Sequence, residues 1–218
     1  STVIATDPDN GQLRSLADSY KIETLPIPEN IGGRFCVFTP VGLFPSLFAG
    51  IEIKKVLEVA EKIKNQLREK DLKENILIKA ASFLYSLKFK KNINQTVLTP
   101  YSSKLKILSP WFVQLWAESL GKKDSVDGKE IYEGLTPIGA YGATDQHSQM
   151  QLFMDGPKDK CVIFIEICNF KHDFKLENKE EGSTFSKLKN STLKELLKAE
   201  LEGTLKAFEE AGRPYFLI

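Results

Sequence analysis

The sequence predicts an α/β protein in which helices cover both faces of a parallel β-sheet. Short apolar runs that are typical of strands alternate with longer segments of helical periodicity, as in proteins built on parallel sheets. Alternation of this kind implies a parallel sheet that is covered on both faces. A length of 218 residues with 42% hydrophobic residues is enough for one well-formed core.

In the first part of the chain, strand-like and helical segments follow one another closely. A turn at 7–11 separates the first two elements, and Pro40 stands where a helix can begin. Apolar residues recur every three or four positions in the helical segments. The expected elements are a strand over 2–6, a helix over 12–20, an extended piece over 22–27, a buried strand over 34–39, a core helix over 41–50, and amphipathic helices over 53–71 and 76–90.

The second part of the chain continues the alternation. Ser109 followed by Pro110 is the preferred order for a helix cap and first helical position, and Gly121 can end that helix. The glycines and prolines after it indicate a loop. The expected elements are a strand over 94–99, a helix from 109 to 121, a charged and glycine-rich loop over 122–141, a short helix over 146–154, a buried strand over 160–168, a helix over 192–212 and a strand over 214–218.

Charge and cysteine content exclude several classes of partner and site. The net charge is +1, and lysines alternate with acidic residues as on solvated helix faces, so we expect no nucleic-acid partner. Prolines and glycines interrupt the longest uncharged stretch, 35–51, so we expect no membrane span. Cys36, Cys161 and Cys168 lie in apolar stretches without metal-ligand spacing, which predicts buried, reduced thiols in a cytoplasmic protein.

The two histidines of the chain have different surroundings. His172 lies in a charged stretch after a strand and is expected to be a surface residue. His147 lies in a glycine-flanked run at the start of a predicted helix, where backbone amides can face a ligand. We regard His147 as a candidate acid or base.

Arg34 and Glu118 are two further candidates, each with an ordinary alternative. Arg34 follows two glycines and precedes an apolar run, so it can direct a fixed positive charge at an oxyanion or pair with a carboxylate across a sheet; these readings are equally supported. Glu118 is near the end of its helix, where the dipole disfavours a negative charge, and this suits a general base. The alternative is an exposed surface glutamate.

Three segments together resemble the glucose-6-phosphate isomerase family, in its bacterial branch. They are Asn30-Ile-Gly-Gly-Arg-Phe35, Trp116-Ala-Glu-Ser-Leu-Gly-Lys122, and Thr136-Pro-Ile followed by Gly142-Ala-Thr-Asp-Gln-His-Ser-Gln149. The resemblance extends over nearly the whole chain, with the motifs in the family's order, and it matches the C-terminal half of the family.

The resemblance implies a fold, an activity and an assembly. The family interconverts glucose 6-phosphate and fructose 6-phosphate through a cis-enediol, without metal or organic cofactor. It is built from two flavodoxin-like sugar-isomerase domains and works as a homodimer. In this chain, residues 1–40 would be the end of the first domain and the crossover, and residues 41–218 would be the second domain. The sugar phosphate would be the ligand, with neither nucleic acid nor membrane as partner.

The same resemblance assigns roles to five residues. His147 would assist ring opening, Glu118 would move the proton between C2 and C1, and Arg34 would stabilise the negative charge of the intermediate. Gly33 and Gln146 would line the sugar site. No metal ligand is expected.

Departures from the family pattern predict that the chain is inactive alone. The family's phosphate-binding loop and catalytic lysine have no counterpart here, and its histidine reaches the site from the neighbouring subunit. The chain also begins and ends within strand-like runs, which indicates a fragment. Two other readings remain open: a non-catalytic sugar-phosphate-binding module of the same fold, and an isomerase that also accepts mannose 6-phosphate.

Overall fold

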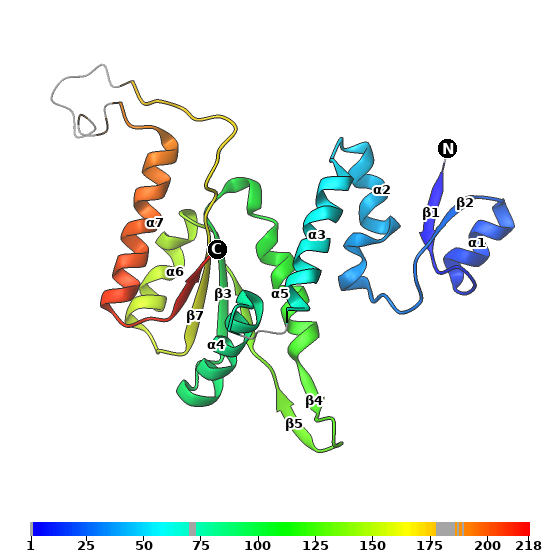
Figure 1. Ribbon diagram of the computed structural model, residues 1–218, viewed down its shortest axis with the longest axis horizontal. Coiled ribbons are helices and arrows are strands. Elements are labelled where there is room, and N and C mark those ends of the chain that lie inside the picture. Colours follow the sequence, from blue (N-terminus) through cyan, green and yellow to red (C-terminus); the bar gives the residue numbers. More distant parts are fainter. Residues whose placement is uncertain (1, 70–72, 178–185, 187, 189) are drawn as a thin grey trace. The chain divides into compact units, whose positions relative to one another are not determined.

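The computed structural model describes residues 2–69, 73–177, 186, 188 and 190–218, which form two compact units (Figure 1). The first unit is residues 1–82 and the second is residues 83–218. This division is one of compactness and does not coincide with residue 40, so the predicted domain boundary there stays a prediction.

In the first unit, a two-stranded parallel sheet precedes a series of helices. The strand expected over 2–6 and the extended piece expected over 22–27 are present as a pair, and the first helix has the predicted bounds. The long helix predicted over 53–71 ends earlier, and positions 70 and 71 lie outside the described residues. The elements are β1 (Val3–Thr6), α1 (Gln12–Tyr20), β2 (Glu23–Pro26), the 3₁₀ helix η1 (Gly33–Phe38), α2 (Pro40–Phe48), α3 (Ile53–Leu67) and the start of α4 (Ile76–Lys91).

The buried strand predicted over 34–39 is wrong. The segment forms η1, in which the amide of Phe35 donates to Gly32 and that of Thr39 donates to Cys36, and none of its residues is buried. The core position predicted for the helix after it is also wrong, because α2 contains no buried residue and Phe48 is 78% exposed. A short apolar run has the same composition in a strand, in a helical turn or on a surface, so periodicity could not separate them.

Asn75 begins α4 and attaches it to the end of α3. Its side-chain oxygen accepts hydrogen bonds from the amides of Leu77 and Ile78, as a helix-capping asparagine does, and its side-chain nitrogen donates to the carbonyl of Gln66 at 2.8 Å. The side chain is buried, with all three contacts satisfied inside the unit.

The second unit is built on a four-stranded parallel sheet. Its strand order, β6-β3-β7-β8, is second-first-third-fourth in chain order, which is the doubly wound order of flavodoxin-like proteins. The α/β prediction is confirmed. The elements are the rest of α4, β3 (Gln95–Pro100), the 3₁₀ helix η2 (Ser103–Leu105), α5 (Leu108–Leu120), β4 (Lys122–Asp124), β5 (Glu130–Glu133), β6 (Thr136–Gly139), α6 (Thr144–Asp155), β7 (Lys160–Ile165), α7 (Leu193–Glu210) and β8 (Tyr215–Leu217).

Helices cover both faces of this sheet because alternate strand residues point to opposite sides. Val97 and Val162 point to the face covered by α6 and α7, where a cluster forms with Phe153, Leu201 and Phe208. The adjacent strand residues point to the other face and pack against α5. Figure 1 shows α6 and α7 together beside the sheet.

Phe164 is the centre of the larger cluster. Its ring is fully buried and makes edge-to-face contacts with the rings of Tyr101, Phe208 and Tyr215, at centroid separations of 6.0, 5.4 and 6.0 Å. Aromatic pairs in this geometry are stabilising beyond the area they bury. Phe164, in β7, therefore joins β8 and the residue that follows β3 to α7.

The loop predicted over 122–141 instead contains three strands. β4 and β5 form an antiparallel hairpin, and β6 pairs with β3. Pro137 lies in β6 and lacks an amide proton; the strand tolerates it because β6 pairs on one side only, at the edge of the described sheet. Glycine and proline content led to the wrong assignment.

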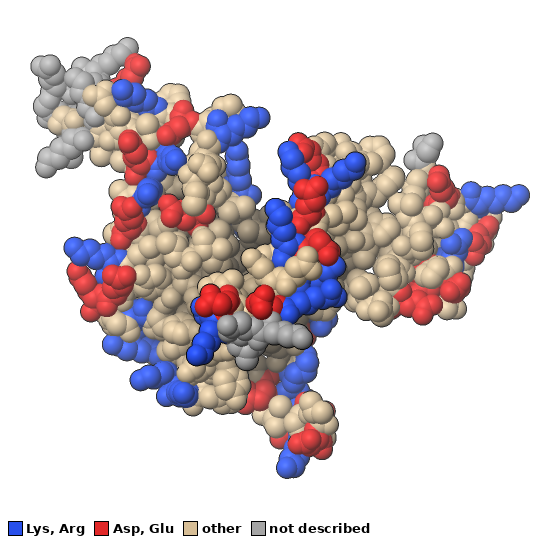
Figure 2. Space-filling view, viewed as in Figure 1, with Lys and Arg blue, Asp and Glu red and all other residues tan. Residues whose placement is uncertain are grey.

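The prediction of three buried thiols is correct for one cysteine. Cys161 in β7 is fully buried, and burial raises the pKa of its thiol to about 12. Cys36 is half-buried and Cys168 is exposed. No helix in the described part of the chain is long and apolar enough to cross a membrane. Figure 2 shows basic and acidic side chains interspersed on the visible face.

Replacing Phe164 with alanine is expected to lower the free energy of unfolding by about 3–5 kcal/mol, because the cavity would remove contacts with three rings. Urea unfolding followed by circular dichroism measures the change. Val126, in the turn of the hairpin, is fully exposed, so Val126→Ala should change stability by less than about 0.5 kcal/mol. Equal losses in the two variants would contradict this account of the core.

Candidate functional site

The segment 140–147 leaves the carboxyl end of β6 and leads into α6. Its backbone continues the pairing with β3, because the amide of Ala140 donates to Leu98 at 2.9 Å and that of Gly142 donates to Pro100 at 3.1 Å. Ligands of doubly wound proteins bind outside the carboxyl ends of the strands, so this segment is at the edge where a site is expected.

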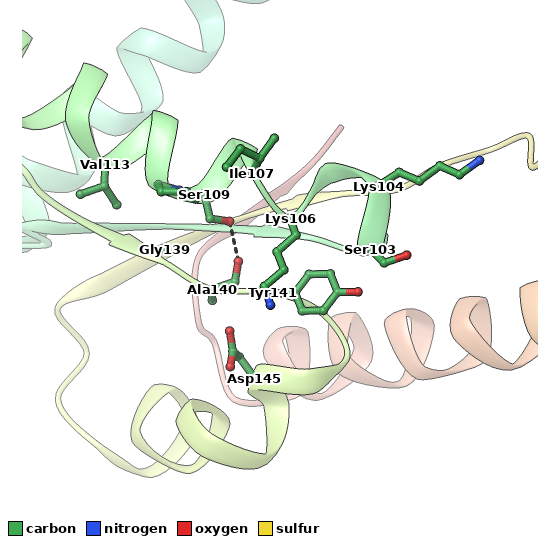
Figure 3. A pocket seen from close by; sticks show the side chains of 11 residues that line it. Ser103, Lys104, Lys106, Ile107, Ser109, Val113, Gly139, Ala140, Tyr141 and Asp145 are labelled. Atoms are coloured by element: carbon green, nitrogen blue, oxygen red, sulfur yellow. Dashed lines mark hydrogen bonds between the residues drawn. The ribbon is translucent and has the colours of Figure 1, made fainter. Parts of the chain in front are cut away.

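Ser109 ties the start of α5 to the same segment. The sequence predicted it as a helix cap, but α5 begins one residue earlier, at Leu108, and the Ser109 side chain is buried. Its hydroxyl donates to the carbonyl of Ala140 at 2.7 Å (Figure 3). The serine therefore serves a long-range contact, which the local Ser-Pro pattern did not reveal.

The Tyr101 ring packs against the segment 140–147 at Gly142. Its ring is 1% exposed and lies against Gly142 so closely that a Cβ atom at that glycine would be 2.4 Å from a ring carbon. The hydroxyl donates to Thr204 on α7 at 3.4 Å. Burial raises the pKa of the Tyr101 phenol, so the group stays protonated as a donor.

His147 lies in the first turn of α6 with an exposed side chain. The residue before it, Gln146, points the other way: its amide nitrogen donates to the hydroxyl of Thr204. The candidate acid or base is thus accessible, whereas the carboxamide predicted to line the sugar site is bound to α7. Its contact with sugar stays a prediction.

Glu118 lies two residues before the end of α5, with an exposed side chain. Its carboxylate accepts a hydrogen bond from Gln114 at 3.1 Å, and the amine of Lys122 donates to its backbone carbonyl at 3.3 Å. The position near the helix end is as predicted. The carboxylate is held on the helix surface while remaining open to solvent.

Glu118 and His147 lie at opposite ends of the parallel strands. Glu118 is near the amino ends (the amino edge) and His147 is near the carboxyl ends (the carboxyl edge). The start of α5 is bonded at Ser109 to the carboxyl-edge segment, and the helix then runs back to the hairpin that precedes β6. Nine residues of helix separate Ser109 from Glu118, which is roughly 14 Å along the axis. The unit does not bring these two candidates together.

The amino edge, where Glu118 lies, is braced by an ion pair. Lys88 of α4 contacts the carboxylate of Glu133 at the end of β5 and donates to the carbonyl of Gly134 at 2.7 Å. The Lys88 ammonium holds the pKa of the Glu133 carboxyl below its ordinary value. The pair attaches the hairpin to α4.

Arg34 and Gly33 lie in the first unit, on η1. The guanidinium of Arg34 is 4.7 Å from the centroid of the Phe35 ring, a cation–π contact, and its side chain is half-buried. A Cβ atom at Gly33 would meet nothing within 4 Å, so its backbone is open. The expectation that Arg34 enters a buried strand is wrong, since η1 is a surface helix.

A pocket of about 690 Å³ lies at the carboxyl edge of the second unit. Figure 3 shows Lys106 and Asp145 extending toward one another beside the Tyr141 ring, and the Lys106 amine is 5.6 Å from that ring's centroid. The volume suits a small ligand. The sequence did not single out Lys106, Tyr141 or Asp145. The feature that could have identified them is their position after β3 and β6, at the strand ends where ligands bind.

No group of three or more histidine, cysteine, aspartate or glutamate side chains is arranged to hold a metal ion among the residues described.

The phosphoglucose isomerase family matches residues 17–191 of the chain. The chain belongs to this family. Glucose-6-phosphate isomerase from Carboxydothermus hydrogenoformans is 37% identical over 99% of the chain, and the protein of that name from Rubrobacter xylanophilus is 39% identical over 98%. The chain covers 47% and 48% of these two relatives, so it spans about half their length.

Solved structures of similar proteins have the same fold. A protein from Thermus thermophilus, described as hypothetical, is 37% identical and superimposes with a TM-score of 0.89, covering 99% of this chain and 50% of that one. A glucose-6-phosphate isomerase from Chlamydia trachomatis, at 24% identity and a TM-score of 0.75, supports the fold alone. It covers 93% of this chain and 37% of that one.

Replacing Gly142 with alanine is expected to destabilise the second unit by about 1–3 kcal/mol, because the new methyl group overlaps the buried Tyr101 ring. Gly203 in α7 is the matched control: its Cβ direction is open, so Gly203→Ala should be neutral or stabilising by up to about 1 kcal/mol. Thermal unfolding of both variants tests this, and wild-type stability of Gly142→Ala would contradict the packing described.

Proposed function

We propose that this chain supplies part of the active site of a glucose-6-phosphate isomerase, which interconverts glucose 6-phosphate and fructose 6-phosphate. The observation that carries the proposal is the similarity over 98–99% of the chain to relatives of that name, together with the presence of Glu118 and His147 in the motifs that carry the family's acid and base. Both side chains are exposed and so can reach a substrate.

The chemistry follows from the three ionisable groups. His147 transfers a proton at the ring oxygen as the sugar ring opens. Glu118 takes the proton from C2 of the open-chain aldose, which leaves a cis-enediol in its anionic form with the charge on O1. Once the O2 hydroxyl proton has moved to O1, Glu118 returns its proton to C1 and the ketose forms. The permanent charge of Arg34 stabilises the negative charge that develops on the enediol oxygens, and the open backbone of Gly33 lets the sugar approach closely.

The placement of Glu118 and His147 favours an active site shared by two copies in a homodimer. Each copy presents the glutamate at the amino edge of its sheet and the histidine at the carboxyl edge. In a twofold dimer, the glutamate of one copy and the histidine of the other can contribute to the same site. The phosphate-binding loop and the lysine of the family pattern have no counterpart in this sequence, and the chain covers 47% of the length of one such relative. We place the enzyme in the cytoplasm, as a glycolytic and gluconeogenic isomerase.

In the complete gene product, Glu118→Gln is expected to lower kcat at least 100-fold, because the amide cannot accept the C2 proton; general-base catalysis typically contributes about 10²–10⁴. A coupled assay with fructose 6-phosphate measures the rate. Glu210, at the end of α7 and also exposed, is the matched control, and Glu210→Gln should keep wild-type kcat. Full activity of Glu118→Gln would refute the proposed base.

The shared site predicts complementation between two inactive variants. Mixed dimers of Glu118→Gln and His147→Ala chains contain one intact site, so random reassociation of equal amounts should restore about a quarter of wild-type activity. Each variant reassociated with itself is the control and should stay inactive. If both groups act within one chain, the mixture recovers no activity.

A further inference from the structure

We propose that Thr204, together with Tyr101, positions His147 by holding Gln146, so that Gln146 acts through the helix and makes no contact with the sugar. This inference rests on the proposed function of His147. Three polar side chains from three elements meet at one hydroxyl: Tyr101 after β3, Gln146 in α6 and Thr204 in α7.

The Thr204 hydroxyl is buried, and its hydrogen-bonding capacity is satisfied within the protein. Tyr101 is 1% exposed and Thr204 is 9% exposed, so each of their polar groups needs a partner within the protein. The Thr204 hydroxyl donates to the carbonyl of Glu200 at 2.8 Å. With its own proton committed, its lone pairs accept from the Gln146 amide and from the Tyr101 phenol.

The bond to Gln146 sets the rotation of the first turn of α6. The residue at the helix cap is Ala143, which has no polar side chain to cap the turn. Gln146 and Met150 are one turn apart on the face that packs toward the core, and Phe153 continues that face. His147 is the next residue after Gln146, about 100° further around the helix. Fixing Gln146 against α7 therefore fixes the direction in which the imidazole leaves the helix.

Tyr101 adds a second constraint on the same turn. Its ring lies against Gly142, five residues before His147, while its hydroxyl reaches Thr204. The rigid Tyr101 side chain therefore fixes the position of both the backbone before α6 and the first turn of α6. Positioning matters for catalysis because a displacement of about 1 Å in a reacting group can lower a rate by about 100-fold.

The decisive variant is Thr204→Val, which keeps the volume but removes the hydroxyl. In the complete gene product we expect kcat to fall roughly 10- to 100-fold with less than about a twofold change in KM, since the sugar contacts remain. Thr204→Ser restores the hydroxyl and should recover kcat to within about threefold of wild type. Wild-type kcat in Thr204→Val would overturn the proposal.

A double-mutant cycle separates positioning from sugar binding, and it also applies if Thr204→Val folds poorly. If Gln146 acts through Thr204, Gln146→Leu alone lowers kcat like Thr204→Val, and the double variant is no worse than either single variant. If Gln146 binds sugar, Gln146→Leu raises KM instead, and its effect multiplies with that of Thr204→Val. That second pattern would overturn the proposal.

Two controls distinguish the possible failures. Phe208, on the same helix, is buried but packs against Phe164 and Tyr215, so Phe208→Leu loosens α7 without touching the hydroxyl. We expect Phe208→Leu to lower the thermal midpoint and leave kcat unchanged. A kcat loss equal to that of Thr204→Val would show general destabilisation and overturn the inference.

His147→Ala tests the proposed function itself. Full activity of this variant would refute the histidine's role. Loss of activity in His147→Ala together with wild-type kcat in Thr204→Val would refute the positioning alone.

Discussion

The burial of Tyr101 is the constraint on which the second unit most depends. The ring fills the space between the end of β3 and the segment that leaves β6, and Gly142 has no side chain because the ring occupies its place. On its other side the ring contacts Phe164, the centre of the aromatic cluster. A buried phenol must also satisfy its hydroxyl, and Thr204 does so. One residue thereby links the core to the edge where His147 lies.

The parallel sheet explains why the two candidate catalytic groups are apart. A helix between parallel strands must return from the carboxyl edge to the amino edge, so a residue late in α5 lies at the amino edge. A residue that follows β6 directly lies at the carboxyl edge. Glu118 and His147 occupy these two positions, and the connection itself separates them. The shared active site that we propose is a consequence of this topology, given that both groups act on one sugar.

The errors of prediction have a common physical cause. The segment 34–39 and the helix after it are apolar, but they lie on the surface of the first unit. Apolar composition alone therefore did not predict burial. Pro137 and its neighbouring glycines suggested a loop, but an edge strand tolerates a missing donor. Ser109 resembled a helix cap, but its hydroxyl binds a carbonyl 31 residues away. In each case the outcome depended on whether the segment contacts residues distant in sequence, which the local pattern does not report.

The sequence by itself determined the α/β class, most of the elements and the residue types available for chemistry. Helical periodicity and apolar runs report local structure, and the motifs around Glu118 and His147 identify the family. Only the tertiary structure decided which edge each group occupies and what Gln146 contacts. Its partner Thr204 is 58 residues away, and no local periodicity carries information about such a contact. The glycine-flanked segment is held in place by Tyr101 and Thr204, two residues that the sequence did not single out.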